Sequence, residues 1–174
     1  MFRQIFIKSE HQKYLRIFWR DEPTEPLRSY QLTTVTYGTT SAPYLAVKTL
    51  QKLAYDERDL HTEASNIILS DFYVDDLLTG AGTTEQCIYL RNGLITILQK
   101  GGFKLRKWSS NCQSIIEDLP NADKSLELHN IQEQDQAPKI KTLGLIWQPV
   151  DDCFMFRVAA IDFENIKNIF FRHI

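Results

Sequence analysis

The stretch Phe72-Tyr73-Val74-Asp75-Asp76-Leu77-Leu78 places two adjacent carboxylates inside an apolar segment. Aromatic and β-branched residues before the pair and leucines after it are typical of two short strands, so we expect the aspartates at the tip of a hairpin. Two interpretations of the pair remain open. Aspartate is common in turns, and the pair is then an ordinary solvated turn. Alternatively, the hairpin directs both carboxylates at one Mg²⁺ site, because that ion prefers hard oxygen ligands and phosphoryl transfer depends on well-placed cations.

Two amphipathic segments flank this hairpin and predict helices. The first is expected from Ala42 to about Leu60, with Ser41 as the N-cap and Pro43 in the first turn. The second is expected from Thr84 to Lys100, and the Gly101-Gly102 pair ends it. Its apolar stripe at helical spacing consists of Cys87, Leu90, Leu94, Ile95 and Leu98.

Shorter apolar stretches predict strands. Residues 14–19 and 30–37 are rich in aromatic and β-branched side chains and predict a hairpin across Asp21-Glu22-Pro23-Thr24-Glu25-Pro26. We also expect a strand at 103–108, a short helix at 111–119, a loop at 121–138 and a last hairpin from 139–147 and 153–158. This order predicts an α+β domain whose antiparallel sheet carries the Asp75-Asp76 hairpin, with the helices packed on its other face.

Composition excludes several classes of protein. The chain has 174 residues, 43% of them hydrophobic, which is enough for one ordinary domain. A formal net charge of -2 argues against a strongly basic, tail-driven nucleic-acid binder. Three isolated cysteines without metal-ligand spacing, no recognisable signal peptide and no apolar stretch of roughly 18 residues predict an intracellular, cytoplasmic chain without a membrane span.

Five further blocks accompany the Tyr73-Val74-Asp75-Asp76 box. They are Met1-Phe2-Arg3-Gln4-Ile5, Trp19-Arg20-Asp21 with Glu25-Pro26, Tyr37-Gly38-Thr39-Thr40-Ser41-Ala42-Pro43, Gly101-Gly102-Phe103-Lys104-Leu105-Arg106-Lys107-Trp108 and Thr142-Leu143-Gly144-Leu145. In this order the six blocks resemble reverse transcriptases, and their details are closest to the BEL/Pao group of retrotransposons. The resemblance covers residues 1 to about 158.

The resemblance implies the palm of a right-hand polymerase for residues 1–158, with a C-terminal hairpin like the primer grip, and leaves residues 159–174 unassigned. It also implies a strand at residues 2–7 that lies beside residues 72–74, because the two strands share the metal site in that fold. It implies an RNA-directed DNA polymerase, a nucleotidyltransferase that forms part of a Pol polyprotein and works with its remaining regions. The partners implied are an RNA or DNA template-primer and a deoxynucleoside triphosphate, and the implied cofactor is Mg²⁺, with Mn²⁺ as a substitute. On this resemblance Asp75 ligates the catalytic metals and Asp76 is its less direct companion.

The resemblance also gives roles to single residues, each with a plainer alternative. Phe2, Gly38 and Tyr73 are implied at the incoming nucleotide, although Phe2 also suits a core and Gly38 the end of a strand. Lys107 is implied as a catalytic cation near the leaving pyrophosphate, with Lys104 as the runner-up, whereas a solvated strand face explains both. The resemblance places Leu143 and Gly144 in the primer grip, whereas the plainer alternative is an ordinary hairpin.

The chain also departs from the family's pattern. The first-motif aspartate would lie four positions before Met1, and blocks of the fingers, thumb, connection and nuclease regions are not found in these residues. We therefore expect a polymerase palm fragment that is inactive as an isolated chain. The alternative is a decayed or host-retained palm without catalysis, acting as a nucleic-acid or protein interaction module.

Overall fold

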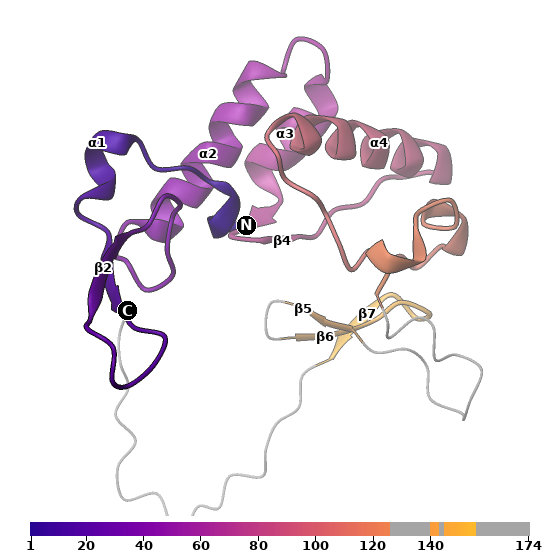
Figure 1. Cartoon of the computed structure of the whole chain (residues 1–174). Coiled ribbons are helices and arrows are strands. Elements are labelled where there is room, and N and C mark those ends of the chain that lie inside the picture. The colour runs from indigo at the N-terminus through magenta and orange to yellow at the C-terminus, as the bar shows by residue number, and fades with distance from the viewer. Residues whose placement is uncertain (126–139, 143–144, 156–174) are drawn as a thin grey trace, which may run out of the picture.

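Three helices form the body of the structure: α2 (Ala42–Asp56), α3 (Thr62–Ser70) and α4 (Thr84–Lys100) (Figure 1). The computed structural model describes residues 1–125, 140–142 and 145–155. Helix α3 packs against both α2 and α4, and short antiparallel strands surround this body. The predicted α+β class is confirmed. None of the helices in the described ranges is long and apolar enough to cross a membrane.

Local capping signals explain where the two predicted helices begin. The side-chain oxygen of Thr83 accepts a hydrogen bond from the Gln86 N–H at 3.2 Å, so Thr83 caps α4 as its residue type suggests. Ser41 occupies the N-cap position of α2 as predicted, but its side chain makes no capping hydrogen bond, and Pro43 lies in the first turn. The predicted end of α2 near Leu60 is wrong, because the helix stops at Asp56 and α3 follows. Helix α3 was not predicted, since no glycine or proline separates it from α2.

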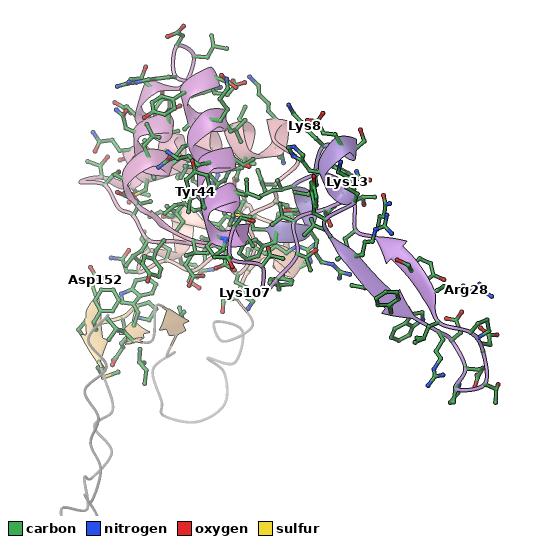
Figure 2. All side chains as sticks on the ribbon, turned by 90° about the vertical axis from the view of Figure 1, so that its left-hand side faces the viewer. Lys8, Lys13, Arg28, Tyr44, Lys107 and Asp152 are labelled. Carbon is green, nitrogen blue, oxygen red and sulfur yellow. The ribbon has the colours of Figure 1, made fainter. Side chains whose placement is uncertain are left out.

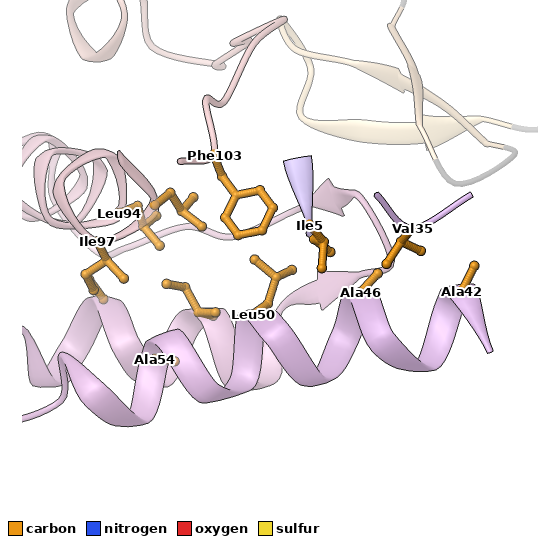
Figure 3. Close-up of a cluster of buried hydrophobic side chains, with 12 residues drawn as sticks. Ile5, Val35, Ala42, Ala46, Leu50, Ala54, Leu94, Ile97 and Phe103 are labelled. Carbon is orange, nitrogen blue, oxygen red and sulfur yellow. The ribbon is translucent and has the colours of Figure 1, made fainter. Parts of the chain in front are cut away.

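The core lies between the three helices and is built largely from small residues on α2. Ala46, Leu50 and Ala54 recur every fourth residue on its buried face, where the side chains of α4 meet them (Figure 3). Helices α3 and α4 approach closely: a Cβ atom on Gly93 would lie 2.9 Å from the Cβ of Ala64. The other buried apolar residues of this core are Ile5, Val35, Ala42, Ala64, Ile68, Leu94, Ile97, Leu98 and Phe103.

The described strands form three separate antiparallel sheets. Strand β1 (Arg16–Trp19) pairs with β2 (Arg28–Gln31), and β3 (Phe72–Tyr73) with β4 (Asp76–Leu77). The third sheet has the order β5 (Ile140–Thr142), β6 (Leu145–Gln148) and β7 (Cys153–Met155). The predicted hairpins are thus present with shorter strands, and the last has one strand more. The expectation of one sheet with helices on a single face is wrong for the described residues.

The N-terminal segment does not form the strand expected at residues 2–7. It begins with a 3-10 helix, η1 (Phe2–Gln4), and a short helix, α1 (Ser9–Gln12), follows. Between them, the N–H of Val35 donates to the Ile5 carbonyl at 2.9 Å and the N–H of Ile7 to the Thr33 carbonyl at 2.8 Å. The backbone partner of this segment is therefore the chain after β2 and not β3.

Residues 103–125 also differ from expectation. The strand predicted at 103–108 is absent, because Lys107 adopts a left-handed φ of 58° that interrupts an extended chain. The helix predicted at 111–119 is reduced to one 3-10 turn, η2 (Gln113–Ile115). A further 3-10 turn, η3 (Asn121–Asp123), lies in the predicted loop, while 126–139 and the unassigned tail lie outside the described residues.

Candidate metal and nucleotide site

The hairpin of β3 and β4 presents the two aspartates through a two-residue turn. Tyr73 pairs with Asp76, so Val74 and Asp75 form the loop. Val74 has a φ of 59°, whereas Asp75 does not have a positive φ. A positive φ at only the first loop residue is the φ pattern of a type II′ turn, where glycine is the usual residue. A β-branched residue there is an outlier, and such strain persists only where the surrounding structure enforces it.

The core holds the strained turn in place. Helix α3 leads directly into β3, and the N–H of Asp71 donates to the Ile67 carbonyl at 2.8 Å. The half-buried Val74 side chain lines a shallow apolar hollow of about 50 Å³ together with Val47 and Leu50 of α2. This hollow is too small for a nucleotide. A ligand of the aspartates would therefore lie on the exposed side of the hairpin, away from the core.

Asp75 and Asp76 are both exposed, and no described residue makes a hydrogen bond or ion pair with either carboxylate. A second adjacent pair, Asp151-Asp152, lies in the turn between β6 and β7 and behaves differently. There the Trp147 indole N–H donates to Asp152 Oδ1 at 3.0 Å, and the Gln148 amide donates to Asp151. The chain thus contains one Asp-Asp turn satisfied by its own strand and one whose four carboxylate oxygens remain available.

This donor set fits a metal ion only in part. The described residues contain no group of three His, Cys, Asp or Glu side chains that could hold a metal. Mg²⁺ is nevertheless commonly held by one or two carboxylates together with substrate phosphates and water. Asp75 and Asp76 therefore suit a metal that arrives with a nucleotide, and they do not form a complete protein cage.

Phe2 contacts Tyr37, the residue that precedes Gly38. The Phe2 ring packs edge-to-face on Tyr37, with ring centroids 5.0 Å apart and an interplanar angle of 69°. Gly38 follows with a φ of 81°, and a Cβ atom there would meet nothing within 4 Å. The backbone conformation therefore explains this glycine, and the space above it is open. Half-buried Phe2 and Phe72 of the hairpin both pack against the same hydrophobic core.

The two lysine candidates differ in their surroundings. Lys104 Nζ lies 2.8 Å from Asp123 Oδ2, a carboxylate that is almost fully buried, so its charge is already compensated. Lys107 is exposed and makes no ion pair with a described residue. Among the described residues nothing joins Lys107 to Asp75 or Asp76. The geometry thus favours Lys107 over Lys104 as an available cation but does not bring it to the hairpin.

The remaining predicted site residues, Leu143 and Gly144, lie outside the described residues. Their neighbours are described: Thr142 of β5 pairs with Leu145 of β6, which leaves two residues for the connection. Tyr73, the third residue implied at the nucleotide, is 69% exposed on β3 directly opposite Asp76. Its ring is available on the same hairpin as the carboxylates.

An ion pair between the buried Arg91 of α4 and Asp118 was missed from the sequence. Arg91, only 4% exposed, donates through Nη2 to Asp118 Oδ2 at 2.8 Å and also binds the carbonyl of Ile115. The guanidinium hydrogen bonds hold the pKa of Asp118 below its usual range, although that carboxylate is itself largely exposed. The signal was present, since Arg91 lies on the apolar stripe between Cys87 and Leu94.

The thiol of Cys112 was also missed. Its Sγ lies 3.1 Å from the Ser114 hydroxyl and 3.8 Å from the Thr84 hydroxyl in the first turn of α4. These hydrogen bonds, that of Ser114 first, lower the pKa of the Cys112 thiol below its ordinary value. Nothing in the sequence around Cys112 indicates these partners, because Thr84 lies 28 residues away.

Comparisons with known proteins add no further evidence: no family model, no curated protein and no solved structure matches the chain.

Proposed function

We propose that the chain is the palm region of a reverse transcriptase of the BEL/Pao type and serves templated nucleotidyl transfer within a longer polymerase. In such a reaction the primer 3′-hydroxyl attacks the α-phosphate of a deoxynucleoside triphosphate and pyrophosphate leaves. Mg²⁺, or Mn²⁺ in its place, supplies charge neutralisation at the phosphates when bound. The six ordered sequence blocks support the family, and the site supports the chemistry.

The observation that carries the proposal is the contrast between the two Asp-Asp turns. Asp151 and Asp152 accept hydrogen bonds from the strand beside them, as a purely structural turn does. Asp75 and Asp76 accept none from the described residues and sit on a turn strained at Val74. Backbone strain is typical of binding and catalytic sites, and exposed carboxylates without partners in the described residues are open to a ligand. A metal–triphosphate complex is the ligand that two adjacent, exposed carboxylates suit.

Phe2 and Lys107 are given the roles that the resemblance implies. Phe2, braced edge-on by Tyr37, offers an aromatic wall that would exclude a 2′-hydroxyl by steric contact. Lys107, exposed and without an ion pair among described residues, offers a cation for the leaving pyrophosphate once substrate and adjoining polymerase regions bring the groups together. Because the hairpin offers only two carboxylates and the described residues hold no group of three metal-ligating side chains, we expect the isolated chain to be inactive in templated primer extension.

The direct test measures, by electron paramagnetic resonance, how tightly the chain binds Mn²⁺ in the presence of a deoxynucleoside triphosphate. The natural chain should bind the complex weakly, with a dissociation constant on the order of millimolar. Asp75→Asn/Asp76→Asn should weaken binding by about tenfold or more, since it removes both anionic ligands. The matched control is Asp151→Asn/Asp152→Asn, which changes the other adjacent pair and should leave binding unaltered.

Equal binding by the natural chain and Asp75→Asn/Asp76→Asn would refute the hairpin as the metal site. Primer extension on a homopolymer template gives a second check. The natural chain should extend no better than Asp75→Asn with Mg²⁺ or Mn²⁺. Extension that depends on Asp75 would contradict the view that the two-carboxylate site is incomplete.

A second candidate function is an interaction module without catalysis. It is favoured by the large exposed side chains on β1 and β2, which include Phe18, Trp19 and Tyr30. These side chains lie on the hairpin that extends away from the helical body (Figure 2). The exposed side chains and the aspartates lie on different strands, so a protein-binding surface would not require the aspartate hairpin.

A further inference from the structure

The hairpin of β1 and β2 has two chemically different faces. Cross-strand partners share a face and successive residues alternate, so Ile17 and Tyr30 lie together with Trp19 and Arg28. The Leu32 N–H donates to the Leu15 carbonyl at 2.8 Å and continues the register by one pair. The apolar hairpin face therefore carries Leu15, Ile17, Trp19, Tyr30 and Leu32, with Arg28 opposite Trp19 at its outer end. The opposite face carries Arg16, Phe18, Ser29 and Gln31.

This alternation is the pattern of a strand pair with one buried face, yet the face is uncovered. Trp19 is 57% exposed, Ile17 43% and Tyr30 41%. All eight strand residues of β1 and β2 are exposed, and the hairpin stands away from the helices (Figure 2). A two-stranded sheet is at best marginally stable in water and needs further strands or a packed layer. The sequence thus provides a docking face that the described residues do not fill.

The two ends of the hairpin carry net charges of opposite sign. At the base, next to α1, Lys8, Lys13 and Arg16 outnumber the single acid Glu10. The turn between the strands, residues 20–27, carries three acids and Arg20, and Arg28 at the start of β2 lies 4.0 Å from Glu25 in an ion pair. Those acids are Asp21, Glu22 and Glu25. In an antiparallel two-fold arrangement the turn of one hairpin would lie opposite the base of the other, which pairs these unlike charges.

We propose that the apolar hairpin face is covered by the same face of a second copy of this chain, in a two-fold dimer with antiparallel hairpins. A two-fold interface uses one patch twice, so both copies bury Ile17, Trp19 and Tyr30 together. A nucleic-acid partner is disfavoured, because the acidic turn would repel phosphates. The inference does not depend on the nucleotidyl-transfer proposal.

The exposed area indicates how strong the dimer is. Two half-exposed aromatic side chains and one isoleucine offer roughly 300 Å² of apolar surface per copy. Stable interfaces bury roughly 800 Å² per partner, so this contact supports a weak, concentration-dependent dimer. We expect a dissociation constant on the order of 10–100 µM at low salt, weakening as salt screens the paired charges.

The test is analytical ultracentrifugation of the full chain over a concentration series on both sides of the expected dissociation constant. Ile17→Thr/Trp19→Thr keeps strand-forming residues but removes the apolar face, and it should raise the dissociation constant at least tenfold. The matched control is Phe18→Thr, which removes a 72% exposed aromatic from the opposite face and should change nothing. Helical circular dichroism checks that each variant is folded.

Charge reversal provides a second, independent measurement. Lys8→Glu/Lys13→Glu reverses the base and Glu22→Lys/Glu25→Lys reverses the turn, so each variant alone should dimerise more weakly and their equimolar mixture should recover the dimer. A natural chain that stays monomeric throughout, or equal losses in the two face variants, would overturn the proposal. So would a monomer whose binding to a single-stranded oligonucleotide is abolished by Ile17→Thr/Trp19→Thr, because the face would then serve nucleic acid.

Discussion

Replacing Val74 by glycine should give a more stable protein than replacing it by alanine. This order of stability is unusual, because glycine normally gives a less stable protein than alanine, owing to its greater conformational freedom in the unfolded chain. At Val74 the φ of 59° strains any residue that carries a Cβ atom, and alanine keeps that strain while glycine does not. Both substitutions remove nearly the same side-chain contacts from the hollow beside α2. The comparison therefore isolates the backbone.

The magnitude follows from two opposing terms. A left-handed backbone costs an L-residue about 1–2 kcal/mol, and glycine avoids this cost. The greater conformational entropy of glycine in the unfolded chain opposes this gain by about 0.5–1 kcal/mol. Val74→Gly should thus exceed Val74→Ala in free energy of unfolding by about 0.5–1 kcal/mol. Val47 lines the same hollow from within α2, where glycine should be less stable than alanine by about 1 kcal/mol. The Gly-minus-Ala difference at Val74 and the one at Val47 should then lie about 1.5–2 kcal/mol apart, with opposite signs.

The assay is urea unfolding of the four single variants, followed by circular dichroism at 222 nm with a common slope. Alanine more stable than glycine at both positions would refute the strained turn. The assignment of Asp75 and Asp76 to an enforced, functional hairpin would then lose its structural support, because an unstrained turn needs no special reason to exist.

Three further predictions concern other parts of the structure. Gly38→Ala should lower the free energy of unfolding by about 1 kcal/mol because φ is 81°, whereas Gly80→Ala, with open space and no positive φ, should be neutral or slightly stabilising in the same urea assay. Because the pKa of Asp118 is lowered in the folded protein, its ionised form stabilises the fold above the unfolded pKa of about 3.9, and this stabilisation is lost as pH falls through the lower folded pKa. Asp118→Asn should therefore be less stable than the natural chain at pH 6 and approach its stability below pH 3. The same difference in melting temperature between the two proteins at both pH values would contradict this. Cys112 should react with iodoacetamide at pH 7.5 faster in the natural chain than in Ser114→Ala, as measured by peptide mass spectrometry, and equal rates would show that the hydroxyl does not lower the thiol pKa.

Signals that act over a few residues predicted the local structure well. The cap at Thr83 and the glycines after Lys100 fix both ends of α4, and Pro43 marks the first turn of α2. The apolar runs around residues 72–78 predicted a hairpin that is present with Val74 and Asp75 as its loop. In each case the determining contact lies within one turn or one hairpin, so the sequence contains all that is needed.

Contacts between distant segments were not predictable in this way. Residues 2–7 alternate weakly enough to suit several partners, and the hydrogen bonds of Ile5 and Ile7 go to residues 33–35. Residues 103–108 alternate like a strand, but Phe103 is drawn into the core beside Gly101 and Lys107 turns left-handed. Tertiary packing overrides β-propensity at both places, because propensity chiefly reflects how a side chain fits its eventual neighbours.

The two Asp-Asp turns show how far a sequence can identify a site. Both follow a short strand with an aromatic residue, so residue type alone gives them the same prediction, a turn. The strand before Asp151 ends in Trp147 and Gln148, whose indole and amide N–H groups are donors that reach back to the carboxylates. The strand before Asp75 ends in Phe72 and Tyr73, which place no N–H donor beside the pair. Because carboxylates without internal donors need solvent or a cation, the residues that precede an aspartate pair distinguish a structural turn from a candidate ligand pair, and this criterion selects Asp75 and Asp76.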